Sequence, residues 1–225
     1  MSLPTKTRQW IVAKKPVDKV NPSETFSIQE KDLPALEQGQ VLIKSLYLSN
    51  DPAQRGWIQE GADPERLYVP PVPQGAPMRA RGIGRVIDSK SEKFQKDALV
   101  AGNVCWTEFA VLKDAECTPV QKVGELSETH FLGALGATGL TALYGLEVVR
   151  AAKEDVVVVS GAAGATGSMV VQIAKHMIGA KRVVGIAGSD DKCRWVESLG
   201  ADACVNYKSK SFKEDLKTAT QVCMP

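Results

Sequence analysis

The chain has 225 residues, of which 44% are hydrophobic and 24% charged, and its formal net charge is +2. This is an ordinary globular composition, and the charge is too close to neutral to indicate a nucleic-acid or membrane surface. No apolar run reaches the roughly 18 residues of a transmembrane helix, and the first residues lack the apolar segment of a secretory signal, so we expect a cytoplasmic protein.

The cysteine and histidine content gives no sign of a metal site. The five cysteines are odd in number, and no two of them have C-x-x-C spacing. The two histidines, His130 and His176, are expected to be surface or locally hydrogen-bonded residues. We therefore expect neither a disulfide framework nor a catalytic metal.

Residues 1–125 are rich in proline and in short β-like runs. The segments 41–48, 82–87 and 106–112 are apolar runs that end at turn-forming residues, which predicts strands. Because no long helical pattern separates them, we expect an antiparallel, barrel-like module. Five prolines within residues 61–77 exclude a helix or a central strand and predict an extended loop.

From residue 126 onward the pattern alternates between strands and helices. Residues 129–151 favour a helix, although glycines interrupt it, and the β-branched run 156–159 is typical of a strand buried on both faces of a parallel sheet. The next helix ends at Gly179. Its predicted apolar stripe consists of Met169, Val170, Ile173, Ala174 and Met177.

A second strand is predicted at residues 182–187. Ser189 has the identity of a helix N-cap, the helix that follows stops at Gly200, and residues 203–206 read as a third strand. A strand-helix-strand-helix-strand order is the first mononucleotide-binding half of a Rossmann fold, a doubly wound parallel sheet of the α/β class.

The turn after the first of these strands has the glycine spacing of a phosphate-binding loop. Gly164 and Gly167 match the second and third glycines of G-x-G-x-x-G, and Ala162 stands at the first. Gly164 allows close approach of a pyrophosphate, and the start of the helix offers free N–H groups. A glycine turn that serves packing alone is the alternative. The predicted contacts are Gly164, Ala165, Thr166 and Gly167.

The end of the second strand indicates which nucleotide binds. NAD sites usually have an acid there for the ribose hydroxyls, whereas this chain has Ala187-Gly188-Ser189 followed by Lys192. A 2′-phosphate needs space and a cation, and this segment offers both. The segment therefore predicts NADP(H). Asp190 and Asp191 oppose this interpretation, but both fit the first turn of a helix. Lys192 has its own alternative as a solvated helix lysine.

With these residues established, the chain resembles the zinc-independent medium-chain dehydrogenase/reductases. The resemblance is to the branch of prostaglandin reductases, leukotriene dehydrogenases and alkenal double-bond reductases. Its most specific segment is L-S-N-D-P-x-x-R-G, at residues 48–56. Further matching segments are residues 139–142, 156–168, 185–192 and 206–208, and the resemblance extends to about residue 217.

The resemblance implies a GroES-like catalytic domain at residues 1–125 and the first half of an NADP-binding Rossmann domain at residues 126–225. It implies NADPH-dependent reduction of the activated carbon-carbon double bond of alkenals and alkenones, with hydride passing to the carbon β to the carbonyl. In the family, the sequence continues past Lys217 into a second half that holds the nicotinamide and forms the homodimer edge. We therefore expect the 225-residue chain as written to be inactive.

Site residues follow from the same resemblance. Gly188, Lys192 and Tyr207 are placed around the adenosine 2′-phosphate, and Ser189 is a further expected cofactor-binding residue. Asn50 and Thr141 are placed toward the nicotinamide, with a turn residue and a helix-packing threonine as equally good alternatives.

The substrate side is less well defined. Ala53 stands where the family often has an aromatic residue, so an aromatic contact to the small-molecule substrate would come from Trp57 or Tyr68, whose alternative is simple packing. No acid–base residue is identified. Two other functions stay open: a quinone reductase of the same superfamily, against which the L-S-N-D-P segment argues, and a non-catalytic nucleotide-binding fragment.

Overall fold

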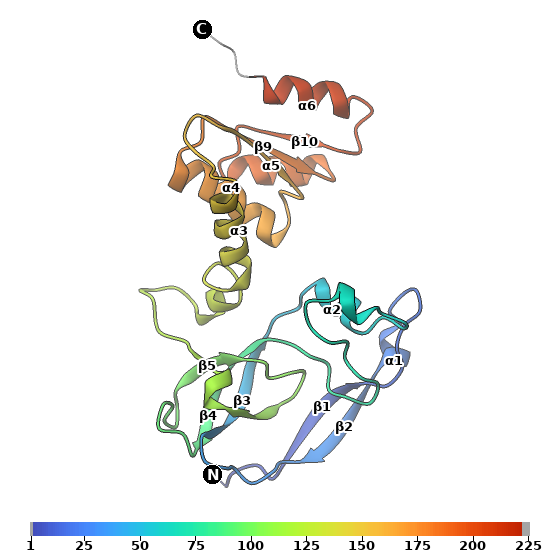
Figure 1. The fold of residues 1–225 in the computed structure, drawn as a ribbon, viewed down its shortest axis with the longest axis vertical. Helices are drawn as coiled ribbons and strands as arrows, with labels where there is room; N and C mark the ends of the chain where they lie inside the picture. Colours follow the sequence, from blue (N-terminus) through green and yellow to red (C-terminus); the bar gives the residue numbers. More distant parts are fainter. Residues whose placement is uncertain (1, 222–225) are drawn as a thin grey trace. The chain divides into compact units, whose positions relative to one another are not determined.

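The structure, a computed structural model, describes residues 2–221. These residues form two compact units, unit 1 up to Leu132 and unit 2 from Gly133 (Figure 1). Across residues 2–221, no helix has the length and apolarity needed to span a bilayer.

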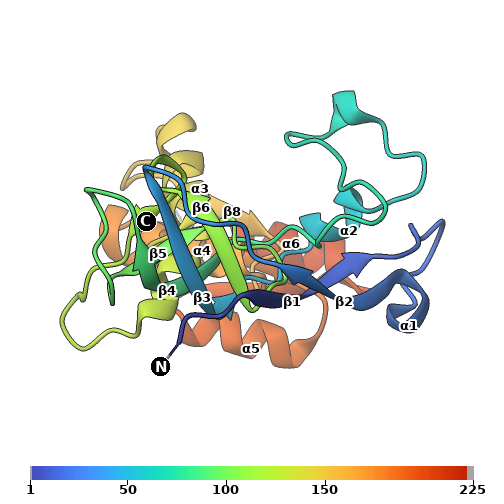
Figure 2. The ribbon, with the colours of Figure 1, turned by 90° about the horizontal axis from the view of Figure 1, so that it is seen from below.

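Unit 1 is antiparallel, as predicted. Strands β1 and β2 form a two-stranded ribbon, and the other five form a sheet of order β6-β3-β4-β5-β7 (Figures 1 and 2). The strands are β1 (Lys6–Val12), β2 (Phe26–Asp32), β3 (Gln40–Leu48), β4 (Gly82–Ser89), β5 (Leu99–Gly102), β6 (Phe109–Lys113) and β7 (Thr118–Pro119). The short helical segments are α1 (Pro22–Thr25), α2 (Ala53–Trp57), η1 (Pro64–Arg66), η2 (Asp114–Glu116) and η3 (Glu128–Leu132).

The core of the five-stranded sheet forms around β3, which lies between β4 and β6. Val41 and Ile43 are fully buried and pack with Val86, Phe94 and Val100. β-branched residues suit this position because they fill a pleated surface with little loss of side-chain freedom. The proline-rich residues 61–77 contain only the 3₁₀ turn η1, consistent with the loop predicted there.

The strand predicted at residues 106–112 begins later, at Phe109. Cys105 has a left-handed backbone with φ of 56°, which breaks the strand on its N-terminal side. The residues between them bond to β1 instead: Trp10 N–H donates to the Trp106 carbonyl at 2.9 Å, and Glu108 N–H donates to the Arg8 carbonyl at 3.0 Å.

Unit 2 contains a three-stranded parallel sheet of order β10-β9-β8, which confirms the predicted α/β half-fold. The strands are β8 (Val156–Ser160), β9 (Arg182–Ala187) and β10 (Ala203–Asn206). The helices are α3 (Ala137–Val148), α4 (Ala165–Gln172) with its π-helical continuation η4 (Ile173–Ile178), α5 (Asp190–Ser198) and α6 (Phe212–Thr220).

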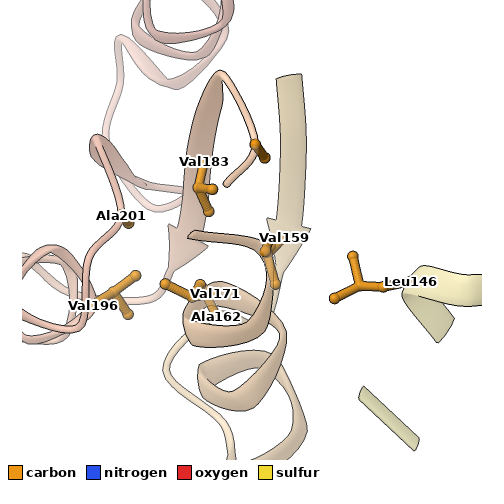
Figure 3. Packing of buried hydrophobic residues seen from close by; sticks show 9 residues of the cluster. Leu146, Val159, Ala162, Val171, Val183, Val196 and Ala201 are labelled. Atoms are coloured by element: carbon orange, nitrogen blue, oxygen red, sulfur yellow. The ribbon is translucent and has the colours of Figure 1, made fainter. Parts of the chain in front are cut away.

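Helices cover both faces of this sheet. On one face, Val159 and Val183 of the strands meet Val171 of α4 and Val196 of α5 (Figure 3). On the other face, α6 packs over β9 and β10, where Val184 and Val205 are buried with Ala219. Burial of such side chains contributes about 1.5–3 kcal/mol each, so this small core is the main source of stability in unit 2.

Three details from residue 128 onward differ from the sequence predictions. The helix predicted at residues 129–151 is interrupted: η3 ends at Leu132, and α3 starts only after the extended backbone of Gly136 (φ −117°, ψ −156°). Val158 was expected to be buried but is 46% exposed, since the cluster beneath α6 includes Val156 of β8 but not Val158. Met177 is 73% exposed, because the π-helical turn rotates it out of the apolar stripe.

Candidate nucleotide-binding site

The site lies at the edge of the parallel sheet that is formed by the carboxyl ends of its three strands. Since β8, β9 and β10 run parallel, the segments that follow Ser160, Ala187 and Asn206 lie at the same edge. Two hydrogen bonds fix these segments to β9: Ala162 N–H donates to the Ile186 carbonyl and Tyr207 N–H to the Ala187 carbonyl, each at 3.0 Å. This edge is where doubly wound sheets bind their ligands.

The glycine loop between β8 and α4 depends on glycine at two positions. Gly161 has φ of +61°, and a Cβ at Gly167 would lie 2.3 Å from the Gly161 carbonyl oxygen. Gly164 is the N-cap of α4, and no side chain of residues 2–221 caps this end. Gly164, Ala165 and Thr166 are exposed, so the first N–H groups of α4 are accessible to a phosphate.

The turn after β9 packs against the turn after β10. A Cβ at Gly188 would lie 3.0 Å from both Cε1 and Oη of Tyr207, so the tyrosine ring lies against a glycine. Tyr207 is 55% exposed, and the Lys208 ammonium lies 5.9 Å from its ring centroid. The structure thus brings together Gly188 and Tyr207, which the resemblance had placed around one phosphate.

Ser189 caps α5, as predicted: its Oγ accepts the Lys192 N–H at 3.3 Å. The Lys192 side chain is exposed, and within residues 2–221 no carboxylate forms an ion pair with it. The two neighbouring acids both have other partners. Asp191 pairs with Arg194, and Asp190 Oδ1 accepts a hydrogen bond from the Asn206 carboxamide at 2.7 Å.

Asn50 lies in unit 1, two residues after the end of β3. It borders a cavity of about 360 Å³ that Phe26, Met78 and Trp106 also line. Gln54, which our sequence analysis missed, supports this loop: it is 5% exposed, accepts the Asp51 N–H at 3.0 Å and donates to the Arg79 carbonyl at 2.9 Å. Its position inside the N-D-P-x-x-R-G segment was the available signal.

The remaining predicted residues belong to both units: Trp57 and Tyr68 lie in unit 1, and Thr141 lies in unit 2. Trp57 is 8% exposed in the core of unit 1, and Tyr68, 78% exposed, sets its ring edge against Trp57 with 6.2 Å between centroids. Thr141 is exposed on α3, where its hydroxyl donates to the Ala137 carbonyl at 2.7 Å. Thr141 belongs to unit 2, so neither unit by itself brings it together with Asn50.

The two histidines and two of the cysteines have structural rather than chemical surroundings. His130 Nδ1 lies 2.9 Å from the Ser127 carbonyl and His176 Nε2 lies 3.0 Å from the Leu199 carbonyl, so both histidines are locally bonded. Burial raises the pKa of the Cys204 thiol to about 12 and that of Cys117 to about 11, as expected for inert thiols. Within residues 2–221, no three His, Cys, Asp or Glu side chains converge as metal ligands.

Comparison with known proteins identifies relatives over nearly the whole chain. Residues 8–120, half of the chain, match the family described as the N-terminal domain of oxidoreductase, and residues 165–223 match the one described as zinc-binding dehydrogenase. Mouse prostaglandin reductase 1 is 38% identical over 87% of this chain and 56% of its own length. The NADPH-dependent curcumin reductase of Escherichia coli is 34% identical over 95% of this chain and 60% of its own length.

A solved structure gives the same result. CurA from Vibrio vulnificus in complex with NADPH superimposes with a TM-score of 0.83 at 33% identity, covering 94% of this chain and 61% of the other. The chain therefore spans little more than half the length of the relatives that it matches. Together, the parallel half-sheet, the glycine loop and these matches show that the chain belongs to the zinc-independent branch of the medium-chain dehydrogenase/reductases.

Proposed function

We propose that this chain provides the NADP(H)-adenosine site of a reductase that acts on activated carbon-carbon double bonds of alkenals and alkenones. The observation that carries the proposal is the exposed Lys192, which has no carboxylate partner in residues 2–221, beside the contact between Gly188 and Tyr207. A 2′-phosphate needs a cation and space, and this turn offers both.

Different residues of the site would bind different parts of the nucleotide. The N–H groups at the start of α4 would bind the pyrophosphate, because they are unpaired at a positive helix end. Lys192 would bind the 2′-phosphate, and Tyr207 would cover the adenosine beside Gly188. Names of relatives, such as NADPH-dependent curcumin reductase and prostaglandin reductase, support the same nucleotide and an enone-type substrate.

NADPH, when bound, supplies the hydride, so the protein's part is positioning and polarisation. In unit 1, Asn50 is held by the loop that Gln54 supports and borders a cavity of about 360 Å³. We propose Asn50 and the exposed ring of Tyr68 as the contacts on the nicotinamide and substrate side. The edge of β8 opposite β9 has no strand partner in residues 2–221, so we propose that this chain binds nucleotide without turnover.

Two measurements test the proposal. Calorimetric titration of the chain with 2′,5′-ADP and 5′-AMP should show at least a tenfold preference for the 2′-phosphorylated nucleotide, and equal affinities would contradict it. NADPH oxidation should then be followed with enals, enones and quinones. The chain alone should show no turnover, while a version completed with the C-terminal part of the E. coli curcumin reductase should reduce enones. Preference of that version for quinones would overturn the substrate class.

A further inference from the structure

Two acidic residues lie at the beginning of α5, next to the lysine proposed to bind phosphate. Asp190 and Asp191 are the first two residues of this helix, and Lys192 is the third. A free carboxylate here would repel a 2′-phosphate and attract the ribose hydroxyls of NAD instead, since an acid after the second strand is the usual feature of NAD sites. A preference for NADP(H) therefore requires that both carboxylates bond to other side chains and not to the nucleotide.

Each carboxylate is occupied by a different partner. Asp191 pairs with Arg194 one helical turn later, on the same helix. Asp190 has no basic partner within residues 2–221, and its Oδ1 accepts a hydrogen bond from Asn206 Nδ2 at 2.7 Å. Asn206 is the last residue of β10, so this bond links two segments of the site across the sheet edge.

The carbonyl oxygen of the Asn206 carboxamide also forms a hydrogen bond. Its Oδ1 accepts the Lys208 N–H at 3.0 Å, which fixes the turn that carries Tyr207. The neutral amide matches both requirements, because it donates to a carboxylate on one side and accepts from an N–H on the other. An aspartate would keep the second bond but would set two carboxylates against each other.

We propose that Asn206 is a positioning residue that selects NADP(H) by holding the Asp190 carboxylate away from the 2′-phosphate. This inference rests on the proposed function. The simpler role of Asn206, as a turn residue only, makes different predictions: loss of the side chain would then weaken binding of any adenosine nucleotide, and removal of the Asp190 charge would not restore it.

The experiment is a mutant cycle on the whole chain with two probes, 2′,5′-ADP and 5′-AMP, titrated calorimetrically at one low ionic strength. Asn206→Ala should weaken 2′,5′-ADP binding roughly fivefold, as expected when a carboxylate is free to move closer to the phosphate, and change 5′-AMP binding less than twofold. Adding Asp190→Asn should restore 2′,5′-ADP binding. Adding Asp191→Asn instead is the matched control and should not, because Asp191 already has Arg194.

The outcomes separate the two hypotheses. Equal binding of both probes by the unmodified chain would overturn the proposed function. A preference for 2′,5′-ADP that Asn206→Ala leaves intact, an equal loss of both probes, or a loss that Asp190→Asn does not restore would overturn the role of Asn206. If the alanine variant does not fold, Asn206→Ser serves instead, since its hydroxyl still accepts the Lys208 N–H but is too short to reach Asp190, and the same results are expected.

Discussion

The ring of Tyr207 occupies the space in which a side chain at Gly188 would lie, with 3.0 Å between a Cβ there and Tyr207 Oη. Gly188→Ala should therefore displace the ring. Because Tyr207 is 55% exposed, it can move at small cost, and we expect less than about 1 kcal/mol of lost stability but several-fold weaker 2′,5′-ADP binding. Thermal unfolding and calorimetry measure the two effects. Unchanged binding would show that the ring position is irrelevant.

Lys192 is expected to contribute a charge-assisted bond to the 2′-phosphate. Lys192→Ala removes about 1.5–3 kcal/mol of binding, so affinity for 2′,5′-ADP should fall tenfold or more while affinity for 5′-AMP stays nearly constant. The matched control is Lys153→Ala, which removes an exposed lysine from the turn before β8, at the opposite edge of the sheet. A similar loss for both nucleotides would exclude Lys192 from contact with the phosphate.

Gly167 and Gly164 should respond differently to alanine. A Cβ at Gly167 would lie 2.3 Å from the Gly161 carbonyl oxygen, whereas at Gly164 the same distance would be 3.2 Å. Gly167→Ala should therefore lower the free energy of unfolding by about 1–3 kcal/mol, and Gly164→Ala by clearly less. Urea unfolding followed by circular dichroism gives both values. Equal destabilisation would mean that the loop adjusts to either methyl group.

Asp202 should make the stability of unit 2 depend on pH. Burial of its carboxyl acts to raise its pKa, but the bonds from Lys175 Nζ at 2.6 Å and Val183 N–H at 2.7 Å outweigh this and lower the pKa below the ordinary 3.8. A lowered pKa in the folded state stabilises the fold at neutral pH, and this stabilisation is lost as the pH falls through that pKa.

Asp202→Asn is therefore expected to cost about 1–2 kcal/mol at pH 7, and the difference from the unmodified chain should shrink below about pH 4. Urea unfolding at a series of pH values measures this. Glu154→Gln, at an exposed position before β8, is the control and should change stability little at any pH. A constant difference across the series would mean that the carboxylate charge plays no part.

Local sequence signals were sufficient for the strands and caps of unit 2. β9 and β10 have the predicted bounds, Ser189 caps α5, and Gly179 ends the preceding helix with φ of 73°. Each of these features depends on residues within one or two turns of each other, where periodicity and backbone preference decide the structure. The glycine loop could be located for the same reason.

Features that depend on distant partners could not be predicted. The bond between Asn206 and Asp190 joins residues 16 positions apart, and neither residue has a local pattern that reveals it. The left-handed Cys105, which shortens β6, and the π-helical turn that exposes Met177 are likewise set by packing. β2 has a mostly exposed surface, so it lacks the alternation that would distinguish it as a strand.

The hydroxyl of Thr7, buried between β1 and β6, donates to the Phe109 carbonyl and accepts the Phe109 N–H, both at 3.0 Å and across 102 residues of chain. During synthesis, this contact between β1 and β6 therefore cannot form until residue 109 has left the ribosome, whereas the strand pairs β1–β2, β3–β4 and β4–β5 lie earlier in the chain. The parallel strands of unit 2 instead pair in the order in which they are made. The nucleotide-binding edge can thus assemble stepwise, whereas the contact that joins β1 to β6 in the N-terminal unit forms only late.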